Sequence, residues 1–135
     1  MTISGDFPHI TNRRIASNGI ELNIAEQGKD DAPLIVMLHG FPESWFSWRH
    51  QFAPLAAAGY HVVAPDMRGY GESDKPADIT AYNQVEIVND IKGLVGALGY
   101  ETAIVIGHDW GGPTAWSCAL WHPEIFTAVG VLSVP

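Results

Sequence analysis

The sequence predicts an α/β fold: a mostly parallel sheet with an N-terminal antiparallel hairpin and helices on both faces. Three observations carry this prediction. Short apolar runs alternate with helical patterns from residue 34 onward, Asn18 and Gly19 separate two alternating runs, and a glycine-flanked turn at residues 107–112 follows an apolar run. Strands that alternate with helices favour parallel pairing, whereas an Asn-Gly dipeptide between alternating runs is typical of a hairpin.

The first half of the chain supplies the hairpin and two further strands. Residues 13–17 and 20–26 alternate in polarity and form the predicted hairpin. Residues 34–38 (LIVML) and 61–64 (HVVA) are continuous apolar runs, as expected of buried parallel strands. Between these two runs, residues 44–58 are dense in aromatic side chains and predict one helix.

A loop and a long helix come next. The loop at residues 65–74 is rich in glycine, and we expect Asp66 and Arg68 within it to form an ion pair. Residues 83–98 carry one apolar stripe and predict the clearest helix of the chain, with Asn83 as its N-cap.

The last elements repeat the strand and helix alternation. Residues 103–106 (AIVI) are β-branched enough to form a buried strand, residues 113–121 predict a helix, and residues 128–134 predict a final strand. The turn between the first two lies at the carboxyl end of a strand, where ligands bind in open α/β sheets.

Composition indicates one globular domain of 135 residues, with 47% hydrophobic and 16% charged residues. A net charge of −8 argues against nucleic acid and anionic membrane surfaces as partners. The single cysteine, Cys118, excludes an internal disulfide, fits a reducing compartment and is expected to pack in the core. The sequence shows no signal peptide and no apolar stretch of membrane-spanning length, so we expect a cytoplasmic location.

Asp109 occupies the centre of the turn at residues 107–112 (GHDWGG). A strand, a tight turn with small flanking residues and then a helix form a nucleophile elbow, here with Asp in place of the more familiar Ser. We expect Gly107 and Gly111 to be the positions where a Cβ would collide with the opposite limb of the turn. The elbow places Asp109 at a helix N-terminus, where backbone N–H groups and the helix dipole favour an anion.

The choice of Asp narrows the chemistry. A carboxylate at a helix N-terminus is already ionised and needs no base to activate it. Attack on a peptide or an ester would give a reactive anhydride, so the carboxylate suits displacement at saturated carbon, with an alkyl ester as the intermediate. Epoxides and alkyl halides are therefore the expected electrophiles. A simple N-cap role for Asp109 is the structural alternative.

Residues 39–42 (HGFP) follow the strand at residues 34–38 and suit an oxyanion loop. In that role the backbone N–H groups of Phe41 and Trp110 would be the two donors. An ordinary strand-to-helix turn is the alternative, and the elbow 70 residues later makes the oxyanion loop the better interpretation. His39 is expected to be a structural hydrogen-bonding residue, and the bond between Phe41 and Pro42 is a candidate cis peptide.

The chain resembles the N-terminal half of an α/β-hydrolase of the epoxide hydrolase family. The matching segments, in order and correctly spaced over nearly all of the chain, are residues 39–45 (HGFPESW), 47–51 (SWRHQ), 66–73 (DMRGYGES) and 107–112 (GHDWGG). The resemblance implies that Asp109 is the nucleophile and that Phe41 and Trp110 supply the oxyanion-hole N–H groups. It further implies that Trp110 and Pro42 contact substrate and that a small-molecule epoxide is the substrate. The sequence shows no metal-ligand cluster and no phosphate-binding loop, so we expect no metal and no cofactor.

Two other functions stay open at this point. Haloalkane and fluoroacetate dehalogenases share the Asp elbow, but some of them place Asn after the His-Gly pair to bind halide. This chain has Phe41 there, which favours the epoxide side. The non-enzymatic alternative is a truncated domain that keeps the fold without the chemistry.

Several parts of the family's site have no match in this chain. The family places an acid and a catalytic His after the nucleophile, together with a cap domain that carries two tyrosines. His122 is the single later histidine and is expected to be structural, and the four tyrosines fall in scaffold segments: Tyr60, Tyr70, Tyr82 and Tyr100. We therefore expect residues 1–135 to form the N-terminal part of one α/β-hydrolase core domain, without the cap and the C-terminal strands and helices. Such a piece would associate with the missing half or with itself through an open edge near residues 129–132, and alone it would turn over little or no substrate.

Overall fold

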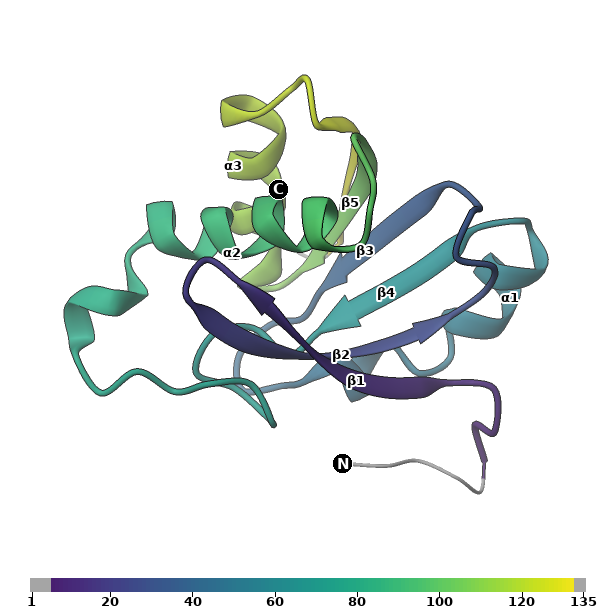
Figure 1. Ribbon diagram of the computed structural model, residues 1–135, viewed down its shortest axis with the longest axis horizontal. Coiled ribbons are helices and arrows are strands. Elements are labelled where there is room, and N and C mark those ends of the chain that lie inside the picture. The colour runs from purple at the N-terminus through teal and green to yellow at the C-terminus, as the bar shows by residue number, and fades with distance from the viewer. Residues whose placement is uncertain (1–5, 133–135) are drawn as a thin grey trace.

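The computed structural model describes residues 6–132. Within this range six strands form one sheet in the order β1-β2-β4-β3-β5-β6 (Figure 1). The first three pairs along the sheet involve the strands β1 (Thr11–Ser17), β2 (Ile20–Gln27), β4 (His61–Pro65) and β3 (Leu34–Leu38). β2 pairs antiparallel with both β1 and β4, whereas β4 and β3 are parallel.

The other edge of the sheet is parallel throughout. β3 pairs with β5 (Ala103–His108), and β5 pairs with β6 (Phe126–Leu132). β6 is the last strand of the sheet within the described part of the chain, and Leu132 at its end is 51% exposed. The predicted mostly parallel sheet with an N-terminal hairpin is therefore confirmed, and the expected open edge lies where the sequence places it.

Among the described residues, three α-helices and two short 3-10 helices connect the strands. Their bounds are η1 (Trp45–Trp48), α1 (Phe52–Ala57), η2 (Ile79–Tyr82), α2 (Gln84–Ala97) and α3 (Gly111–Trp121). The prediction for α2 is confirmed, since the Oδ1 atom of Asn83 accepts a hydrogen bond from the N–H of Glu86 at 2.9 Å. α3 and β6 both begin two residues earlier than predicted, and residues 133–134 of the predicted last strand lie outside the described range.

The turn of the hairpin has the geometry that its sequence favours. Asn18 and Gly19 adopt φ values of 52° and 79°, and Ser17 pairs with Ile20 across the turn. Positive φ at both central residues is the signature of the two-residue turn whose twist matches that of the flanking strands.

The single helix predicted over residues 44–58 is wrong. The segment divides into η1 and α1, with the residues around Arg49 in a turn between them. Pro54 explains the division, because proline lacks the N–H that an uninterrupted helix would direct to the carbonyl of His50, and its ring would clash with that carbonyl. Within α1, Pro54 lies in the first turn, where an N–H is not needed.

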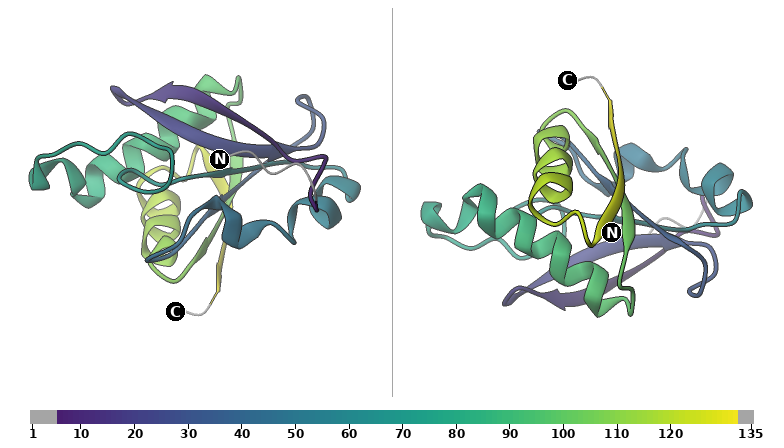
Figure 2. Two further views of the ribbon diagram at one scale, coloured as in Figure 1. Left: turned by 90° about the horizontal axis from the view of Figure 1, so that it is seen from below. Right: turned by 90° about the horizontal axis from the view of Figure 1, so that it is seen from above.

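The sheet buries both faces against helices. Side chains that alternate along β3 point to opposite sides, so Val36 belongs to the core beneath α2 and α3, whereas Ile35 and Met37 belong to the core beneath α1 and η1. Figure 2 shows α2 and α3 on one side of the strands and α1 on the other. Cys118 of α3 is fully buried in the first core, and this burial raises the pKa of its thiol to about 12.

Parallel pairing places the carboxyl ends of β3, β4 and β5 at one edge of the sheet. The segments that follow these strands are residues 39–43, 66–74 and 109–111, which are far apart in sequence and adjacent in space. The segments 39–43 and 109–111 carry the predicted site residues. Within the described range no helix has the length and apolar character needed to span a membrane.

Candidate active site

The elbow between β5 and α3 holds Asp109 in a conformation that few residues adopt. Its φ is +55°, in the left-handed region that Asp and Asn tolerate better than other side chains. A Cβ at Gly107 would overlap the carbonyl of Gly111 across the turn, as predicted. At Gly111 the expectation is wrong, because the atoms that a Cβ would meet are the carbonyl groups of Leu38 and His39. Gly111 therefore lets the elbow approach the end of β3.

The close approach of β3 brings the loop at residues 39–42, the predicted oxyanion loop, to the carboxylate. The backbone N–H of Phe41 donates a hydrogen bond to Oδ2 of Asp109 at 3.0 Å. A Cβ at Gly40 would lie 2.7 Å from that same oxygen, so only glycine fits between the loop and the carboxylate. The structure thus brings together two segments that are separated by 68 residues in the chain.

Backbone N–H groups lower the pKa of the Asp109 carboxyl below its ordinary value of 3.8. The largest cause is the hydrogen bond from the Phe41 N–H, followed by that from the Trp110 N–H, with a smaller contribution from His108. Each of these favours the charged form of the carboxyl. Asp109 is therefore an ionised carboxylate at neutral pH, as the sequence predicts for a group at a helix N-terminus.

The oxyanion loop is held in shape by Glu43. The N–H of Gly40 donates to Oε1 of Glu43 at 3.0 Å, and the N–H of Glu43 donates back to the Gly40 carbonyl at 3.0 Å. The peptide between Phe41 and Pro42 is cis, which confirms the candidate named from the sequence. The side chain of Phe41 is 60% exposed, so this residue faces the site with its backbone while its ring lies at the surface.

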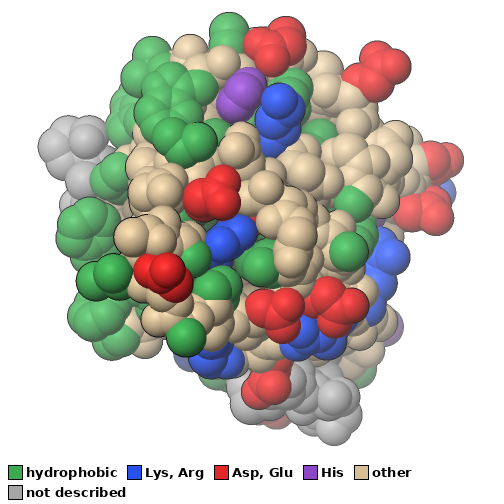
Figure 3. Space-filling view, turned by 60° about the vertical axis from the view of Figure 1, so that its left-hand side comes forward, with side chains coloured by type: hydrophobic (Ala, Val, Ile, Leu, Met, Phe, Trp, Pro, Cys, Tyr) green, Lys and Arg blue, Asp and Glu red, His purple; other side chains and the backbone are tan. Residues whose placement is uncertain are grey.

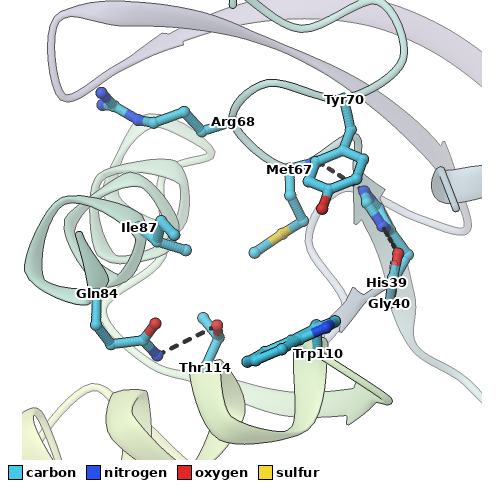
Figure 4. Close-up of a pocket in the computed structure, with 9 residues that line it drawn as sticks. All are labelled: His39, Gly40, Met67, Arg68, Tyr70, Gln84, Ile87, Trp110 and Thr114. Atoms are coloured by element: carbon cyan, nitrogen blue, oxygen red, sulfur yellow. Dashed lines mark hydrogen bonds between the residues drawn. The ribbon is translucent and has the colours of Figure 1, made fainter. Parts of the chain in front are cut away.

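A cavity of about 140 Å³ lies beside the elbow, between α2 and the loop after β4 (Figure 4). Trp110 forms one wall and is the only predicted site residue among those that line this cavity; Pro42 is exposed on the oxyanion loop and does not line it. The residues around the cavity are His39, Gly40, Met67, Arg68, Tyr70, Gln84, Ile87, Trp110 and Thr114.

Tyr70 is the lining residue that sequence reasoning missed most clearly, since the tyrosines were all assigned to scaffold segments. Figure 4 shows its ring next to His39, on the side of the cavity away from α2. Burial, and then the negative charge of Asp109, raise the pKa of the Tyr70 hydroxyl, which places this phenol within electrostatic reach of the carboxylate. The signal that would have found it is its position in a loop after a parallel strand at the carboxyl edge of the sheet.

Helices α2 and α3 are joined at the cavity by polar side chains. The Nε2 of Gln84 donates to the hydroxyl groups of Thr114 and Ser117, each at 3.3 Å. Gln84 lies at the start of α2, where the sequence gives no sign that it would face a cavity. Its amide and the hydroxyl of Thr114 are among the few uncharged polar groups that line this space.

The ion pair predicted between Asp66 and Arg68 is wrong. Arg68 instead forms a bidentate salt bridge with Asp90 of α2, with both N···O distances at 2.8 Å and both side chains buried. Asp66 turns the other way and accepts hydrogen bonds from the backbone N–H groups of Trp45 and Glu72 and from the amide of Asn23. Residues two apart in this loop therefore point to different elements.

His108, beside the elbow, and His122, beyond the far end of α3, both have structural surroundings. The Nδ1 atom of His108 lies 3.5 Å from Glu43, and its ring packs edge-on against Trp48, outside the cavity that Trp110 lines. His122 follows α3 and lies 3.6 Å from Glu124. Within residues 6–132 no group of three or more His, Cys, Asp or Glu side chains is arranged to hold a metal ion. On the face in Figure 3, basic side chains lie among acidic ones and form no continuous patch.

Comparison with known proteins places this site in context. An epoxide hydrolase A of Mycobacterium tuberculosis is 46% identical over 125 residues, covering 93% of this chain and 39% of the relative. An α/β-hydrolase superfamily protein of Bacillus subtilis is 49% identical over 121 residues, covering 90% of this chain and 42% of the relative. The crystal structure of epoxide hydrolase A from Mycobacterium thermoresistibile superposes with a TM-score of 0.92 at 47% identity, covering 93% of this chain and 40% of that chain.

The chain thus spans about two fifths of the length of these relatives. The family profile described as alpha/beta hydrolase fold matches residues 33–134, which include the oxyanion loop, the elbow and all four parallel strands. By fold, by elbow geometry and by this match, the chain belongs to the α/β-hydrolase family.

Proposed function

We propose that this chain carries the nucleophile half of an epoxide hydrolase site, with Asp109 as the nucleophile and a small-molecule epoxide as the substrate. The observation that carries the proposal is the hydrogen bond between the Phe41 N–H and Oδ2 of Asp109 at 3.0 Å, in an elbow that keeps the carboxylate ionised and within reach of solvent. The relatives named epoxide hydrolases support the substrate class.

The proposed reaction has two stages. In the first, a carboxylate oxygen of Asp109 attacks an epoxide carbon, the ring C–O bond breaks, and its electron pair stays on the ring oxygen, which takes a proton to become a hydroxyl. The product of this stage is a hydroxyalkyl ester of Asp109. The group that supplies the proton is not assigned to a residue of this chain.

In the second stage water attacks the carbonyl carbon of the ester. Negative charge develops on the former carboxylate oxygen, and the N–H groups of Phe41 and Trp110 stabilise it. Collapse of the intermediate breaks the bond between Cγ of Asp109 and the ester oxygen, whereas the bond between that oxygen and the alkyl carbon is kept. The diol therefore leaves with one oxygen from the epoxide and one from Asp109, and the restored Asp109 carboxylate carries one oxygen from water. A base that activates the water is not assigned within this chain, and we expect the 135-residue chain alone to stop at the ester or to turn over slowly.

Covalent labelling of the 135-residue chain tests this proposal directly. Incubation with a small terminal epoxide such as styrene oxide should add the mass of one epoxide molecule, and peptide mapping should locate it on Asp109. Asp109→Asn should give no adduct, because the amide is a poor nucleophile, and the matched variant Asp30→Asn, at an exposed loop position, should label like the wild type. Absence of an adduct on the wild type, or equal labelling of Asp109→Asn, would contradict the proposal.

The same experiment separates the dehalogenase alternative. An alkyl bromide of similar size should label Asp109 more slowly than the epoxide if the site is built for epoxides. Faster labelling by the bromide, with release of bromide ion, would assign the chain to the dehalogenases instead.

A further inference from the structure

His39 follows β3 directly and is almost fully buried, with 2% of its surface exposed. Its ring packs edge-on against Tyr70, with the ring centroids 5.0 Å apart. Both ring nitrogens have backbone partners. The N–H of Met67 donates to Nε2 at 2.9 Å, and Nδ1 lies 2.8 Å from the carbonyl oxygen of Gly40.

These two partners determine which nitrogen carries the proton. A backbone N–H is only a donor, so Nε2 must accept from Met67 and has no hydrogen of its own. A backbone carbonyl is only an acceptor, so Nδ1 must be protonated in order to bond to Gly40. The contacts therefore require the neutral imidazole with its proton on Nδ1. Burial lowers the pKa of His39, which keeps the ring neutral at physiological pH.

The carbonyl that His39 holds belongs to the same peptide group as the N–H of Phe41. A trans peptide is planar, and its C=O and N–H point in opposite directions. The carbonyl end accepts two hydrogen bonds, from Nδ1–H of His39 and from the N–H of Glu43 at 3.0 Å. The N–H end donates to Oδ2 of Asp109. Holding the carbonyl therefore sets the direction of the N–H.

We propose that His39 is the positioning residue of the oxyanion hole: its Nδ1–H, set by the Met67 N–H on the opposite ring nitrogen, holds the Gly40–Phe41 peptide so that the Phe41 N–H faces Asp109. The catalytic part of this inference rests on the proposed function, because it takes the Phe41 N–H as an oxyanion donor. Both ring nitrogens of His39 bond to backbone groups, so its ring makes no hydrogen bond to the carboxylate. It links the loop after β4, through Met67, to the donor that acts on the ester.

The proton position is directly measurable in the wild-type chain. Long-range ¹H–¹⁵N correlation spectra at pH 7 should show Nδ1 protonated and Nε2 unprotonated for His39. A proton on Nε2 in the wild type would overturn the proposal, because Met67 and His39 would then both present donors and Nδ1 would have no hydrogen for Gly40. This measurement needs no variant and no substrate.

Two substitutions test the two hydrogen bonds of the imidazole one at a time. In His39→Asn the side-chain amide nitrogen takes the place of Nδ1 and keeps the donor to Gly40. In His39→Gln the amide reaches the place of Nε2, so the contact with Met67 is kept and the donor to Gly40 is lost. Both variants replace the ring by an amide in the same buried position, so each serves as the matched control of the other, and their unfolding midpoints show whether both are folded.

The backbone amide of Phe41 reports the result. Its proton resonance should stay close to the wild-type position in His39→Asn, and should move upfield in His39→Gln with roughly tenfold faster exchange with solvent, as expected when a hydrogen bond is opened. Hydrolysis of the Asp109 ester should be about tenfold slower in His39→Gln, less than the loss from deleting an oxyanion donor outright. A wild-type Phe41 resonance in a folded His39→Gln would overturn the proposal.

The proposed function and this inference fail separately. If Asp109 is not alkylated but His39 carries its proton on Nδ1 and Phe41 responds as described, the positioning of the peptide stands and the epoxide chemistry falls. If Asp109 is alkylated and its ester is hydrolysed at the same rate in both variants, with an unchanged Phe41 amide, the chemistry stands and the role of His39 falls.

Discussion

Asp66 and Asp109 occupy equivalent places in the sheet and have opposite surroundings. Each is the first residue after a parallel strand, β4 for Asp66 and β5 for Asp109. Asp66 is 1% exposed, and three donors, from β2, η1 and its own loop, occupy its two oxygens. Asp109 is half-buried and lies at a positive φ, and within residues 6–132 its carboxylate is hydrogen-bonded only by the backbone N–H groups of Phe41 and Trp110.

The difference separates Asp66, a structural carboxylate, from Asp109, the proposed nucleophile. The oxygens of Asp66 are committed to Trp45, Asn23 and Glu72, so the side chain ties η1, β2 and its own loop together. Asp109 has no side-chain donor of this kind among the described residues. Its backbone donors keep it ionised while they leave it accessible, which is the arrangement that a nucleophile requires.

The largest expected effect on stability is that of replacing Asp66. Asp66→Ala should lower the free energy of unfolding by about 3 kcal/mol or more, because two buried donors and one part-buried donor lose their acceptor. Urea unfolding followed by circular dichroism measures this. Asp31→Ala, at an exposed loop position, is the control and should leave the unfolding midpoint close to that of the wild type. Equal midpoints for the two variants would show that Asp66 does not hold the loop.

A pair of glycines gives the next largest effect. A Cβ at Gly111 would overlap the backbone carbonyl of Leu38, so Gly111→Ala should cost about 2 kcal/mol and should also slow labelling of Asp109. Gly96 lies in α2 with open space around it, and Gly96→Ala should instead stabilise the chain by about 0.5–1 kcal/mol. The opposite signs distinguish a close approach at the elbow from the general effect of replacing glycine in a helix. Two losses of similar size would argue against the close approach.

The sequence predicts the parts of this arrangement that depend on local patterns. The hairpin turn at Asn18 and Gly19, the N-cap at Asn83 and the elbow around Asp109 are all set by residues within a few positions of one another. The loop from Gly40 to Pro42 was recognised because a His-Gly pair after a buried strand has a local signature and a family resemblance. These features needed no knowledge of the tertiary structure.

The failures come from contacts between distant segments. Arg68 pairs with Asp90, 22 residues away on α2, and no local pattern distinguishes this partner from the nearer Asp66. Tyr70 and Gln84 reach the cavity because β4 and α2 lie beside the elbow in space. The break between η1 and α1 was the one local error, and Pro54 was the signal that should have decided it.

The pH dependence of labelling measures the pKa of Asp109 in the folded chain. Its pKa in the folded chain lies below the ordinary value of 3.8, so the rate constant with a neutral epoxide should be flat above about pH 5 and fall tenfold per pH unit below the folded pKa. Because the pKa is lowered by folding, the stability linked to this group is present above pH 3.8 and is lost as the pH falls through the folded pKa. In His39→Gln the midpoint should move up toward 3.8. A wild-type midpoint above 3.8 would contradict the backbone donors as its cause.

The smallest expected effect is that of Asp109→Asn on the stability of the fold. Asp109→Asn removes the charge and keeps a side chain that tolerates φ of +55°. The backbone N–H of Phe41 keeps an acceptor in the amide oxygen. Thermal unfolding should therefore match the wild type, although labelling is abolished. A large loss of stability would mean that the Asp109 carboxylate, like that of Asp66, holds the fold together. The contrast between a structural Asp66 and a reactive Asp109 would then be wrong.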